Sequence, residues 1–492
     1  MLLLGIDLGT SSVKVAVIDT DSRQCIASAS FPETEAPIIS YRPGWAEQKP
    51  GDWWEYTRQA ILKLNATAKF NPRLVQAIGI AYQMHGLVTL DRHQQVVRDS
   101  IIWCDSRAVP YGDAAFRGIG QNNCLHTLLN SPGNFTAAKL AWVKDKEPGN
   151  YERIATVMLP GDYICFKLTG SLTTTPSALS EAVLWNFPGH KPARSVMEHF
   201  EFDEELLPPV QEVFSQHGVV TPTVAEQLGL TAGIPVTYKA GDQPNNALSL
   251  NVMTPGEAAA NAGTSGVIYA VTDQLAYDPL SRINSFAHVN HRPGNHRVGV
   301  LLCINGAGIT SSWVRKLSEN TPAYARLNKE AEHISAGADG LIFLPFGNGA
   351  ERMLNNRVMG AQLLQIDFNQ HTKAHIYRAC LEGVACAFRY GLELLSENDI
   401  RPSVIRAAHA NMFLSDVFTQ VFVNTTGIPV ELYETDGSVG AALGAGIGLG
   451  LFSPAVLGQQ QPVKRVDVNN LQDYQQLYYV WKQRLENLLQ SL

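Results

Sequence analysis

The feature that most constrains the fold of this chain of 492 residues is a turn of small residues between two apolar segments, which occurs twice. In the first copy, apolar and alternating residues over 2–17 surround Gly9-Thr-Ser-Ser12. In the second copy, residues 257–271 surround Gly263-Thr-Ser-Gly266. Because short apolar runs and strict alternation both favour strands, each segment predicts a β-hairpin. The copies lie about half a chain length apart, which predicts two similar halves.

The segments between the hairpins indicate an α/β architecture. A capped apolar pattern predicts a helix over 52–64, whereas 74–81 and 235–240 are typical of strands. The turn at Pro255-Gly256 favours a division into an N-terminal domain, 1–249, and a C-terminal domain, 250–492. At the end of the chain, apolar residues at helical spacing over 471–488 indicate core packing or a subunit contact, and we expect a homodimer.

The bulk composition excludes several classes of protein. Hydrophobic residues make up 45% and charged residues 17%, which is typical of a globular protein with buried cores. The net charge of −7 disfavours nucleic acid and anionic membranes as partners. The seven cysteines are dispersed without a CxxC pair, which argues against a disulfide framework or a zinc site. The apolar start of the chain ends at Asp7, which is too early for a signal peptide, so we expect a cytoplasmic protein.

An uncharged stretch over 437–462 contains the GxxxG pattern Gly440-Ala-Ala-Leu-Gly444. A membrane span is conceivable there. However, glycine and alanine dominate the stretch, and Ser, Pro and Gln interrupt it. We therefore favour a small-residue helix pressed closely against a sheet.

Both hairpin turns are candidates for binding phosphate. Turns of small residues present backbone N–H groups and hydroxyls, which bind phosphate oxygens. Asp7 at a strand end, with Thr10 and Lys14 after it, also offers a carboxylate suited to hydrated Mg²⁺. Each turn alone is equally consistent with an ordinary hairpin, but two facing turns could clamp a triphosphate.

A third carboxylate, Asp242, follows the predicted strand at 235–240 and is flanked by glycine. Phosphoryl transfer to an alcohol needs a group that orients the hydroxyl and accepts its proton. An isolated Asp in a turn is often only a turn former. Its position just before the second hairpin favours the catalytic interpretation.

Two polar segments, Gln83-Met-His-Gly86 and Trp103-Cys-Asp-Ser-Arg107, are candidates for binding a polyol. Sugars are held by planar polar groups together with an aromatic or apolar face. The alternative is a buried core histidine and a buried tryptophan, and either segment taken alone fits that alternative as well.

Together these segments resemble the FGGY carbohydrate kinases, a family that shares the fold of actin, hexokinase and the heat-shock chaperone ATPases. The resemblance covers essentially the whole chain in the family's order: Gly5-Ile-Asp-Leu-Gly-Thr-Ser-Ser-Val-Lys14, Gly44-Trp-Ala-Glu-Gln48, Gln83-Met-His-Gly86, Ile102-Trp-Cys-Asp-Ser-Arg107, Leu159-Pro-Gly-Asp-Tyr163, Gly241-Asp242, Asn261-Ala-Gly-Thr-Ser-Gly266, Leu344-Pro-Phe346, Glu351-Arg352 and Leu381-Glu-Gly383.

The resemblance implies two ribonuclease H-like α/β domains around a deep cleft, with the sugar mainly on the N-terminal domain and ATP mainly on the C-terminal one. It implies that Asp242 is the catalytic base and that Asp7 serves Mg²⁺. The substrate-binding set would be Met84, His85, Trp103, Asp105, Asp242 and Gln243, and the ATP-binding set Thr10, Ser11, Lys14, Gly263, Thr264, Ser265, His409 and Asn411.

The Met–His pair is most similar to that of family members that phosphorylate xylulose, so we expect ATP-dependent phosphorylation of a ketopentose. The open alternatives are another polyol (ribulose, fuculose, gluconate or glycerol) or a non-catalytic ATP-dependent sugar sensor. Retention of Asp7, Lys14 and Asp242 argues against the sensor.

The chain departs from the family at the segment Arg406-Ala-Ala-His-Ala-Asn411. The family places glycines there, against adenosine, and glycine permits close backbone approach. A bulkier His409 would change that surface, so we expect it to lie near the nucleotide.

Overall fold

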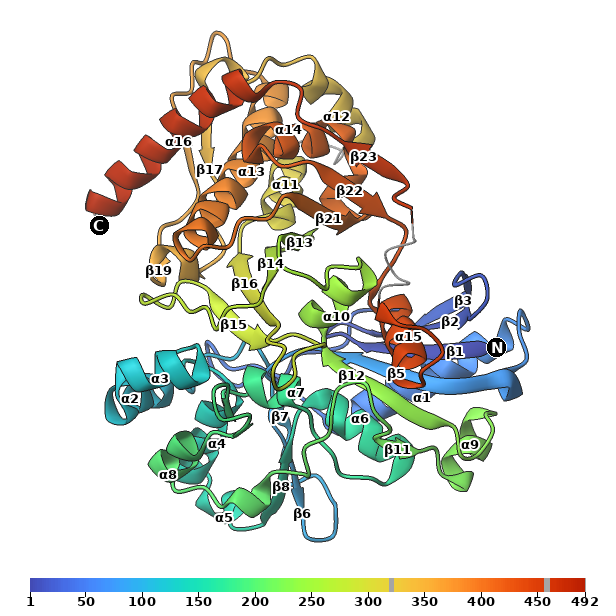
Figure 1. Cartoon of the computed structure of the whole chain (residues 1–492). Helices are drawn as coiled ribbons and strands as arrows, with labels where there is room; N and C mark the ends of the chain where they lie inside the picture. Colours follow the sequence, from blue (N-terminus) through green and yellow to red (C-terminus); the bar gives the residue numbers. More distant parts are fainter. Residues whose placement is uncertain (318–322, 455–460, 492) are drawn as a thin grey trace.

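The computed structural model describes residues 1–317, 323–454 and 461–491, which form two lobes, each built on one large β-sheet (Figure 1). The N-terminal sheet has the strand order β11-β12-β5-β1-β2-β3. Its strands are β1 (Leu2–Leu8), β2 (Val13–Asp19), β3 (Cys25–Phe31), β5 (Val75–Tyr82), β11 (Gly218–Val219) and β12 (Pro235–Gly241).

The C-terminal sheet has the order β15-β16-β14-β13-β21-β22-β23. Its strands are β13 (Glu257–Ala262), β14 (Gly266–Thr272), β15 (Asn284–Ala287), β16 (Val298–Ile304), β21 (Val404–Ala408), β22 (Val430–Tyr433) and β23 (Lys464–Val466).

Four strands in each sheet share one topology. β1 pairs antiparallel with β2 and parallel with β5, and β5 is parallel to β12. In the other lobe, β13 pairs antiparallel with β14 and parallel with β21, and β21 is parallel to β22. Both predicted hairpins and the predicted duplication are confirmed.

The central strands of the N-terminal sheet, β1 and β5, are buried on both faces because they are almost entirely apolar. On one face the sheet packs against α1 (Pro50–Ala66), which carries Trp53 and Ile61 into the core. On the other face lies α15 (Gly437–Gly448), although that helix follows the last central strand of the C-terminal lobe (Figure 1). A Cβ on Gly5 or on Gly79 would overlap backbone atoms of α15.

The helix α15 confirms the interpretation of the Gly440–Gly444 pattern as a small-residue helix against a sheet. In the described ranges, no helix is both long and apolar enough to cross a membrane. The division of the chain in sequence is therefore not a clean division in space, since one helix of the second half completes the core of the first.

The lobes also meet at β15, the edge strand of the C-terminal sheet. Side chains of the N-terminal lobe bond directly to its backbone: Asn130 Nδ2 donates to Ser285 O at 2.6 Å, and Ser177 Oγ donates to Ala287 O at 2.8 Å. Ser180 Oγ accepts the Ala287 N–H at 2.9 Å. This joint carries Phe286 toward the N-terminal lobe.

Helices cover the C-terminal sheet, including α11 (Gly308–Lys316), α12 (Tyr324–Glu332), α13 (Lys373–Glu397) and α14 (Asp416–Thr426). The predicted terminal helix is α16 (Leu471–Ser491). Its residue Trp481 is buried and donates a hydrogen bond to Phe343 O at 2.8 Å. The core-packing interpretation of this helix is confirmed.

The remaining elements are short helices and two-stranded sheets, most of them in the N-terminal lobe. Its helices are α2 (Val109–Ile119), α3 (Gln121–Leu128), α4 (Thr136–Lys146), α5 (Pro148–Tyr151), α6 (Pro160–Thr169), α7 (Pro176–Glu181), α8 (Arg194–Phe200), α9 (Pro222–Leu228) and α10 (Asp242–Ser249). The paired short strands are β4 (Glu47–Gln48) with β7 (Ser100–Ile101), β6 (Val88–Asp91) with β8 (Ile154–Met158), β9 (Trp185–Asn186) with β10 (Lys191–Pro192), β17 (Ile342–Leu344) with β20 (Gln362–Leu364), and β18 (Ala350–Glu351) with β19 (Arg357–Val358).

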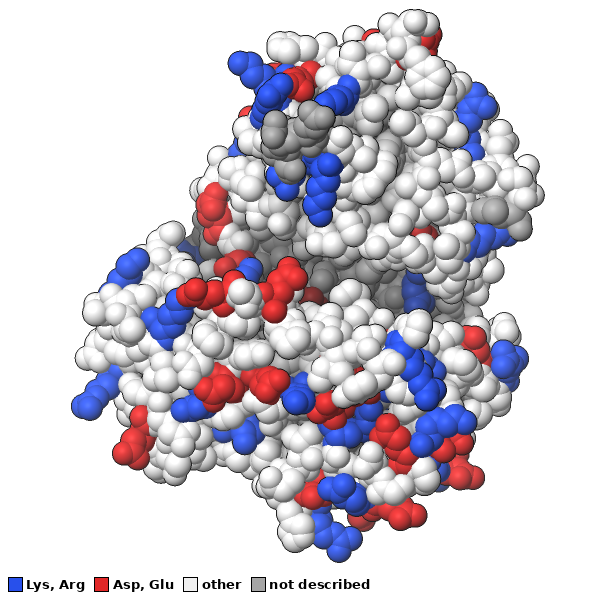
Figure 2. Space-filling model, turned by 180° about the vertical axis from the view of Figure 1, so that it is seen from behind, with Lys and Arg blue, Asp and Glu red and all other residues white. Residues whose placement is uncertain are grey.

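The surface is hollowed between the two lobes, and positive and negative side chains are interspersed on the face that Figure 2 shows. The helix that begins at Asp242, α10 (Asp242–Ser249), contacts β13 and β14 of the C-terminal lobe, so this strand end lies where the lobes meet.

Candidate active site

The first hairpin ends in a charged pair of positions. Asp7 on β1 lies opposite Lys14 on β2, and the Gly9 N–H closes the turn on Ser12 O at 3.0 Å. The Asp7 carboxyl packs against Gly437, where a Cβ would overlap it. Burial first, and then the like charges of Asp242 and Asp436, raise the pKa of Asp7 to about 7, against the opposing effect of Lys14.

Asp242 is the first residue of α10, directly after β12. Burial raises the pKa of this carboxyl to about 6, although Gln243 Nε2 donates a hydrogen bond to it at 3.2 Å. A carboxyl whose pKa lies near neutrality can accept a proton in a reaction and release it afterwards. The predicted base therefore has the environment that the role requires.

The carboxylates of Asp7, Asp242 and Asp436 interact repulsively, so a cation would relieve the cost of holding them together. No cluster of three or more His, Cys, Asp or Glu side chains in the described part of the chain is arranged to hold a metal by itself. Mg²⁺ commonly takes one or two carboxylates and completes its shell with water and phosphate oxygens. Asp7 fits that mode of binding.

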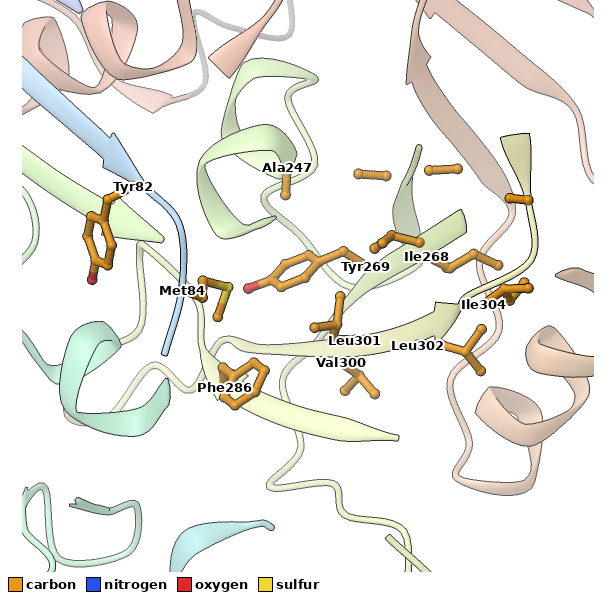
Figure 3. Packing of buried hydrophobic residues seen from close by; sticks show 14 of the residues in the cluster. Tyr82, Met84, Ala247, Ile268, Tyr269, Phe286, Val300, Leu301, Leu302 and Ile304 are labelled. Atoms are coloured by element: carbon orange, nitrogen blue, oxygen red, sulfur yellow. The ribbon is translucent and has the colours of Figure 1, made fainter. Parts of the chain in front are cut away.

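The predicted sugar-binding pair, Met84 and His85, lies close to Asp242. Met84 is buried against Gly241, where a Cβ would lie 2.6 Å from Met84 Cγ, so it touches the residue before the base. Figure 3 shows Met84 beside Tyr269 and Phe286 of the C-terminal lobe. The structure thus brings together residues from both lobes around the position of Asp242.

His85 adopts a left-handed backbone conformation, with φ of 62°. Its ring packs against two aromatic rings that also touch each other, at 4.8 Å from Phe135 and 5.3 Å from Phe286, measured between centroids. Sequence reasoning missed both phenylalanines, because neither belongs to a polar motif. The aromatic wall is the apolar face that a polyol site requires.

Trp103 and Thr10 connect the sugar segment to the first hairpin. Trp103 is half exposed and donates from Nε1 to Thr10 Oγ1 at 2.9 Å, and Thr10 Oγ1 donates to Gln83 Oε1 at 3.1 Å. Gln48 Nε2 donates to Thr10 O at 2.8 Å. A turn predicted to bind phosphate is thereby fixed to the segment predicted to bind the sugar.

Asp105 does not fit its predicted role as a sugar ligand. The residue is fully buried, and Oδ2 accepts the Ala46 N–H at 2.6 Å and pairs with Arg107 at 2.7 Å. Arg107 also pairs with Glu47 at 2.6 Å and lies over the Trp45 ring at 3.8 Å. Both carboxylate oxygens are occupied within the protein, so Asp105 supports the loop that carries Trp103.

The second hairpin opens on a cavity of about 690 Å³, within the size range of small-molecule sites. The expected Gly263, Thr264 and Asn411 line it, together with residues that sequence reasoning missed: Ala262, Gly308, Ile309, Ser311, Ser312, Tyr324, Ala325, Asn328, Tyr377, Leu381, Met412, Leu414, Ser415 and Phe418. Polar groups lie beside the hairpin and apolar side chains line the rest, which suits a nucleoside.

The cavity depends on close contact between the hairpin and α11. The Gly308 N–H donates to Gly263 O at 2.8 Å, the Ile309 N–H donates to Thr264 O at 3.1 Å, and a Cβ on Gly308 would overlap Gly263 O. The sequence carries a signal for this contact, because Asn305-Gly-Ala-Gly308 directly follows a strand.

Three further residues predicted to bind ATP lie on the two hairpins. Ser11 is exposed in the first turn and Lys14 is exposed on β2, while Ser265 is partly exposed in the second turn. All three remain available to a ligand.

His409 lies outside the group of residues that line the cavity. Its Nδ1 is 3.0 Å from Glu434 Oε1, and its N–H donates to Tyr433 O at 2.8 Å. Asn411, two residues on, is exposed, lines the cavity and donates from Nδ2 to Asn261 Oδ1 at 3.3 Å. The expected contact between this segment and the nucleotide would therefore be made through Asn411.

Comparison with known proteins agrees with this arrangement. Residues 2–249 match the N-terminal domain, and residues 258–449 the C-terminal domain, of the FGGY family of carbohydrate kinases. The chain is 26% identical over 490 residues to a xylulose kinase of Bacillus subtilis, covering 98% of this chain and 96% of the relative.

Among solved structures, a xylulose kinase from Rhodospirillum rubrum is 26% identical and superposes with a TM-score of 0.88, covering 99% of both chains. A gluconate kinase from Lactobacillus acidophilus has the same fold, with a TM-score of 0.89, 22% identity and coverage of 99% of this chain and 98% of that one. The two-lobed chain, with its paired hairpins and Asp242 at a strand end between them, belongs to the FGGY family of carbohydrate kinases and is a sugar kinase.

Proposed function

We propose that this enzyme transfers the γ-phosphoryl group of ATP to a ketopentose, with xylulose as the preferred substrate and xylulose 5-phosphate as the product. The observation that carries the proposal is the position of Asp242. This partly buried carboxyl follows a residue in contact with Met84 on one side and interacts electrostatically with Asp7 on the other.

In the proposed reaction, Asp242 accepts the proton of the substrate hydroxyl as that oxygen bonds to phosphorus and the bond to the ADP oxygen breaks. His85 and Met84 orient the sugar against the aromatic wall of Phe135 and Phe286. The turns at Thr10 and Thr264 bind the phosphates through N–H groups and hydroxyls. Asp7 would hold Mg²⁺, which neutralises phosphate charge when it is bound.

Closure of the lobes would exclude water and so limit the hydrolysis of ATP. The contact at β15 would stay fixed in such a closure, because hydrogen bonds join the lobes there directly.

The assignment of xylulose rests on the relatives named xylulose kinase and on the Met84–His85 pair. The likeness of fold to a gluconate kinase keeps other polyols as the second candidate. The test is a coupled ADP-release screen with D- and L-xylulose, ribulose, fuculose, gluconate and glycerol. Turnover that is highest with a xylulose supports the proposal, and a clear preference for another polyol contradicts it.

We also propose that the enzyme acts in the cytoplasm as a homodimer. All seven cysteines are free thiols, with Cys25 and Cys104 exposed, as expected for a reducing compartment. Exposed apolar side chains in the C-terminal lobe, Phe368 at 90% and Val358 at 71%, support a subunit contact. Light scattering of the purified enzyme tests the dimer, and cell fractionation tests the location.

A further inference from the structure

Two ionisable side chains next to His85 have no part in the reaction described above. Glu181, at the end of α7, and Lys139, on α4, expose 1% and 0% of their surface. Such residues are seldom fully buried unless they are paired. Among the residues that the structure describes, the hydrogen bond of the Lys139 ammonium is to a backbone carbonyl and not to a carboxylate.

Both side chains hold the backbone of His85. Glu181 Oε2 accepts the His85 N–H at 3.1 Å, and Lys139 Nζ donates to His85 O at 2.8 Å. Tyr82, also fully buried, orients the carboxylate by donating from its hydroxyl to Glu181 Oε1 at 2.6 Å. The peptide groups on both sides of a residue with φ of 62° are therefore held by side chains that cannot turn toward water.

A left-handed conformation is unfavourable for a residue with a side chain, costing about 1 kcal/mol or more, and persists only where surrounding contacts impose it. Glu181 and Lys139 supply those contacts at His85. Without them, the backbone would relax and turn the imidazole away from its present position.

Glu181 also fixes the orientation of the His85 imidazole ring. His85 Nδ1 lies 2.9 Å from the backbone oxygen of Glu181, and a carbonyl oxygen can only accept a hydrogen bond. Nδ1 must therefore carry the proton, and Nε2 is left with its lone pair. Burial lowers the pKa of His85 to about 3, so the ring is neutral in the physiological range. The side chain is 15% exposed, and its Nε2 makes no hydrogen bond within the described residues.

We propose that Glu181 and Lys139 are positioning residues that hold His85 as a hydrogen-bond acceptor for a substrate hydroxyl, and that they thereby help to set the selectivity for the sugar. The inference rests on the proposed function only in taking the substrate to lie against His85. It does not depend on which polyol the enzyme prefers.

This role differs from simple support of the fold. Charged residues that only stabilised a buried loop could be replaced by apolar ones without loss of sugar recognition, and such replacements are often neutral or stabilising. Lys139 instead occupies a site where burial lowers its pKa to about 7. Strongly perturbed groups of this kind cluster at functional sites.

A double-mutant cycle tests the proposal, with the best substrate from the ADP-release screen. Glu181→Met and Lys139→Met keep the approximate size of each side chain but remove the acceptor and the donor that hold the His85 backbone. Each should raise the KM for the sugar about two- to tenfold, the equivalent of a lost or weakened hydrogen bond, while the KM for ATP stays within about twofold. In a His85→Ala background, the same replacements should change the sugar KM less than about twofold, because they act through the ring.

The matched control is Lys146→Met on the same helix, whose side chain is 57% exposed, and it should leave both KM values unchanged. Effects that add fully to that of His85→Ala, or that alter the KM for ATP equally, would overturn the proposal. If Lys139→Met does not fold, the pair Glu181→Met and Glu181→Gln decides alone. The amide oxygen of glutamine can still accept the His85 N–H, so Glu181→Gln should keep the sugar KM within about twofold of wild type while Glu181→Met raises it.

A second measurement is independent of catalysis. Nitrogen NMR of the full chain labelled in its histidines identifies the His85 signals by their absence in His85→Ala. The proposal requires a proton on Nδ1 and none on Nε2 at neutral pH. A proton on Nε2, or a cationic ring, would contradict it. A sound NMR result with no turnover of any xylulose would refute the proposed substrate and leave this inference standing.

Discussion

The two hairpins at the centre of the molecule share a backbone but differ in charge. In β1–β2, Asp7 lies opposite Lys14, whereas in β13–β14 the corresponding strand end carries Asn261, which lies opposite Val267. The electrostatic neighbours of Asp7 are Asp242 and Asp436, while Asn261 accepts a hydrogen bond from Asn411 at 3.3 Å.

The difference separates binding from chemistry. Both turns present N–H groups and hydroxyls, which suffice to hold phosphate oxygens. The first adds a carboxylate beside the base that can take part in metal binding, and the second opens on a cavity of about 690 Å³. The two hairpins thus have the same backbone geometry. The first carries the charged side chains, and the second borders the nucleoside-sized cavity.

The sharpest test of this division is removal of the base beside the charged hairpin. Asp242→Ala should lower kcat about 10²–10⁴-fold, the usual contribution of general-base catalysis, with ATP binding largely kept. Binding of ATP is followed by calorimetry and turnover by ADP release. Asp399→Asn, at an exposed surface position, is the control. A variant with near-normal kcat would show that the base lies elsewhere.

The same carboxyl predicts the pH dependence of the enzyme. Since the pKa of Asp242 is raised to about 6 and the base must be ionised, kcat/KM should be flat above that pH. Below it, kcat/KM should fall about tenfold per pH unit. A wild-type profile that stays flat down to pH 4 would be inconsistent with Asp242 acting as the base.

A smaller effect is expected when the first hairpin is given the chemistry of the second. Asp7→Asn should raise the Mg²⁺ concentration needed for half-maximal rate about 10- to 100-fold, the range seen when residues that support a metal site are altered. Titration of MgATP at fixed sugar measures it. No such effect is expected in the second hairpin, where Asn261→Ala should leave the Mg²⁺ requirement unchanged.

Asp7→Asn should also stabilise the free enzyme. The folded pKa of Asp7, about 7, lies above its ordinary value of 3.8, so the folded state binds the proton more tightly than the unfolded state does. Stability therefore falls as pH rises from about 4 to 7, and a neutral side chain avoids that loss. Without Mg²⁺, the variant should melt at a higher temperature than wild type at pH 8. A lower melting temperature would mean that Asp7 supports the fold.

The parts of this site that are set by local sequence could be predicted, and the parts that depend on long-range contacts could not. The hairpins, the strand before Asp242 and the Met84–His85 segment were predictable, because local periodicity and turn composition specify them. The neutralisation of Asp105 was not, since its partner Arg107 is shared with Glu47, 60 residues away in the chain. The packing of α15 against the sheet of the N-terminal lobe was also not predictable, because it depends on contact of that helix with Gly5 and Gly79.

The cavity at the second hairpin shows the same limit. Its walls come from segments near Gly308, Tyr377 and Met412, which only the folded chain brings together. The hydrogen bonds from Glu181 and Lys139 to the His85 backbone could not be predicted from the sequence either. The two residues belong to separate helices and to no recognisable motif. Sequence patterns report where backbone turns and polar residues occur, and long-range packing decides which of them face the ligand.

The smallest effect is expected at the segment where the chain departs from the family. His409 pairs with Glu434 and does not line the cavity, whereas Asn411 lines it and bonds to the neutral hairpin. We therefore expect His409→Gly to change the KM values for ATP, GTP and ITP by less than about threefold, as for a surface contact worth a few tenths of a kcal/mol. Asn411→Ala should raise the KM for ATP more than His409→Gly does, because it removes a polar group from the cavity wall. Steady-state kinetics of both variants with the three nucleotides decide the question. Broadened use of GTP or ITP by His409→Gly would mean that the imidazole moves against the nucleotide when the lobes close, and would return this histidine to the site.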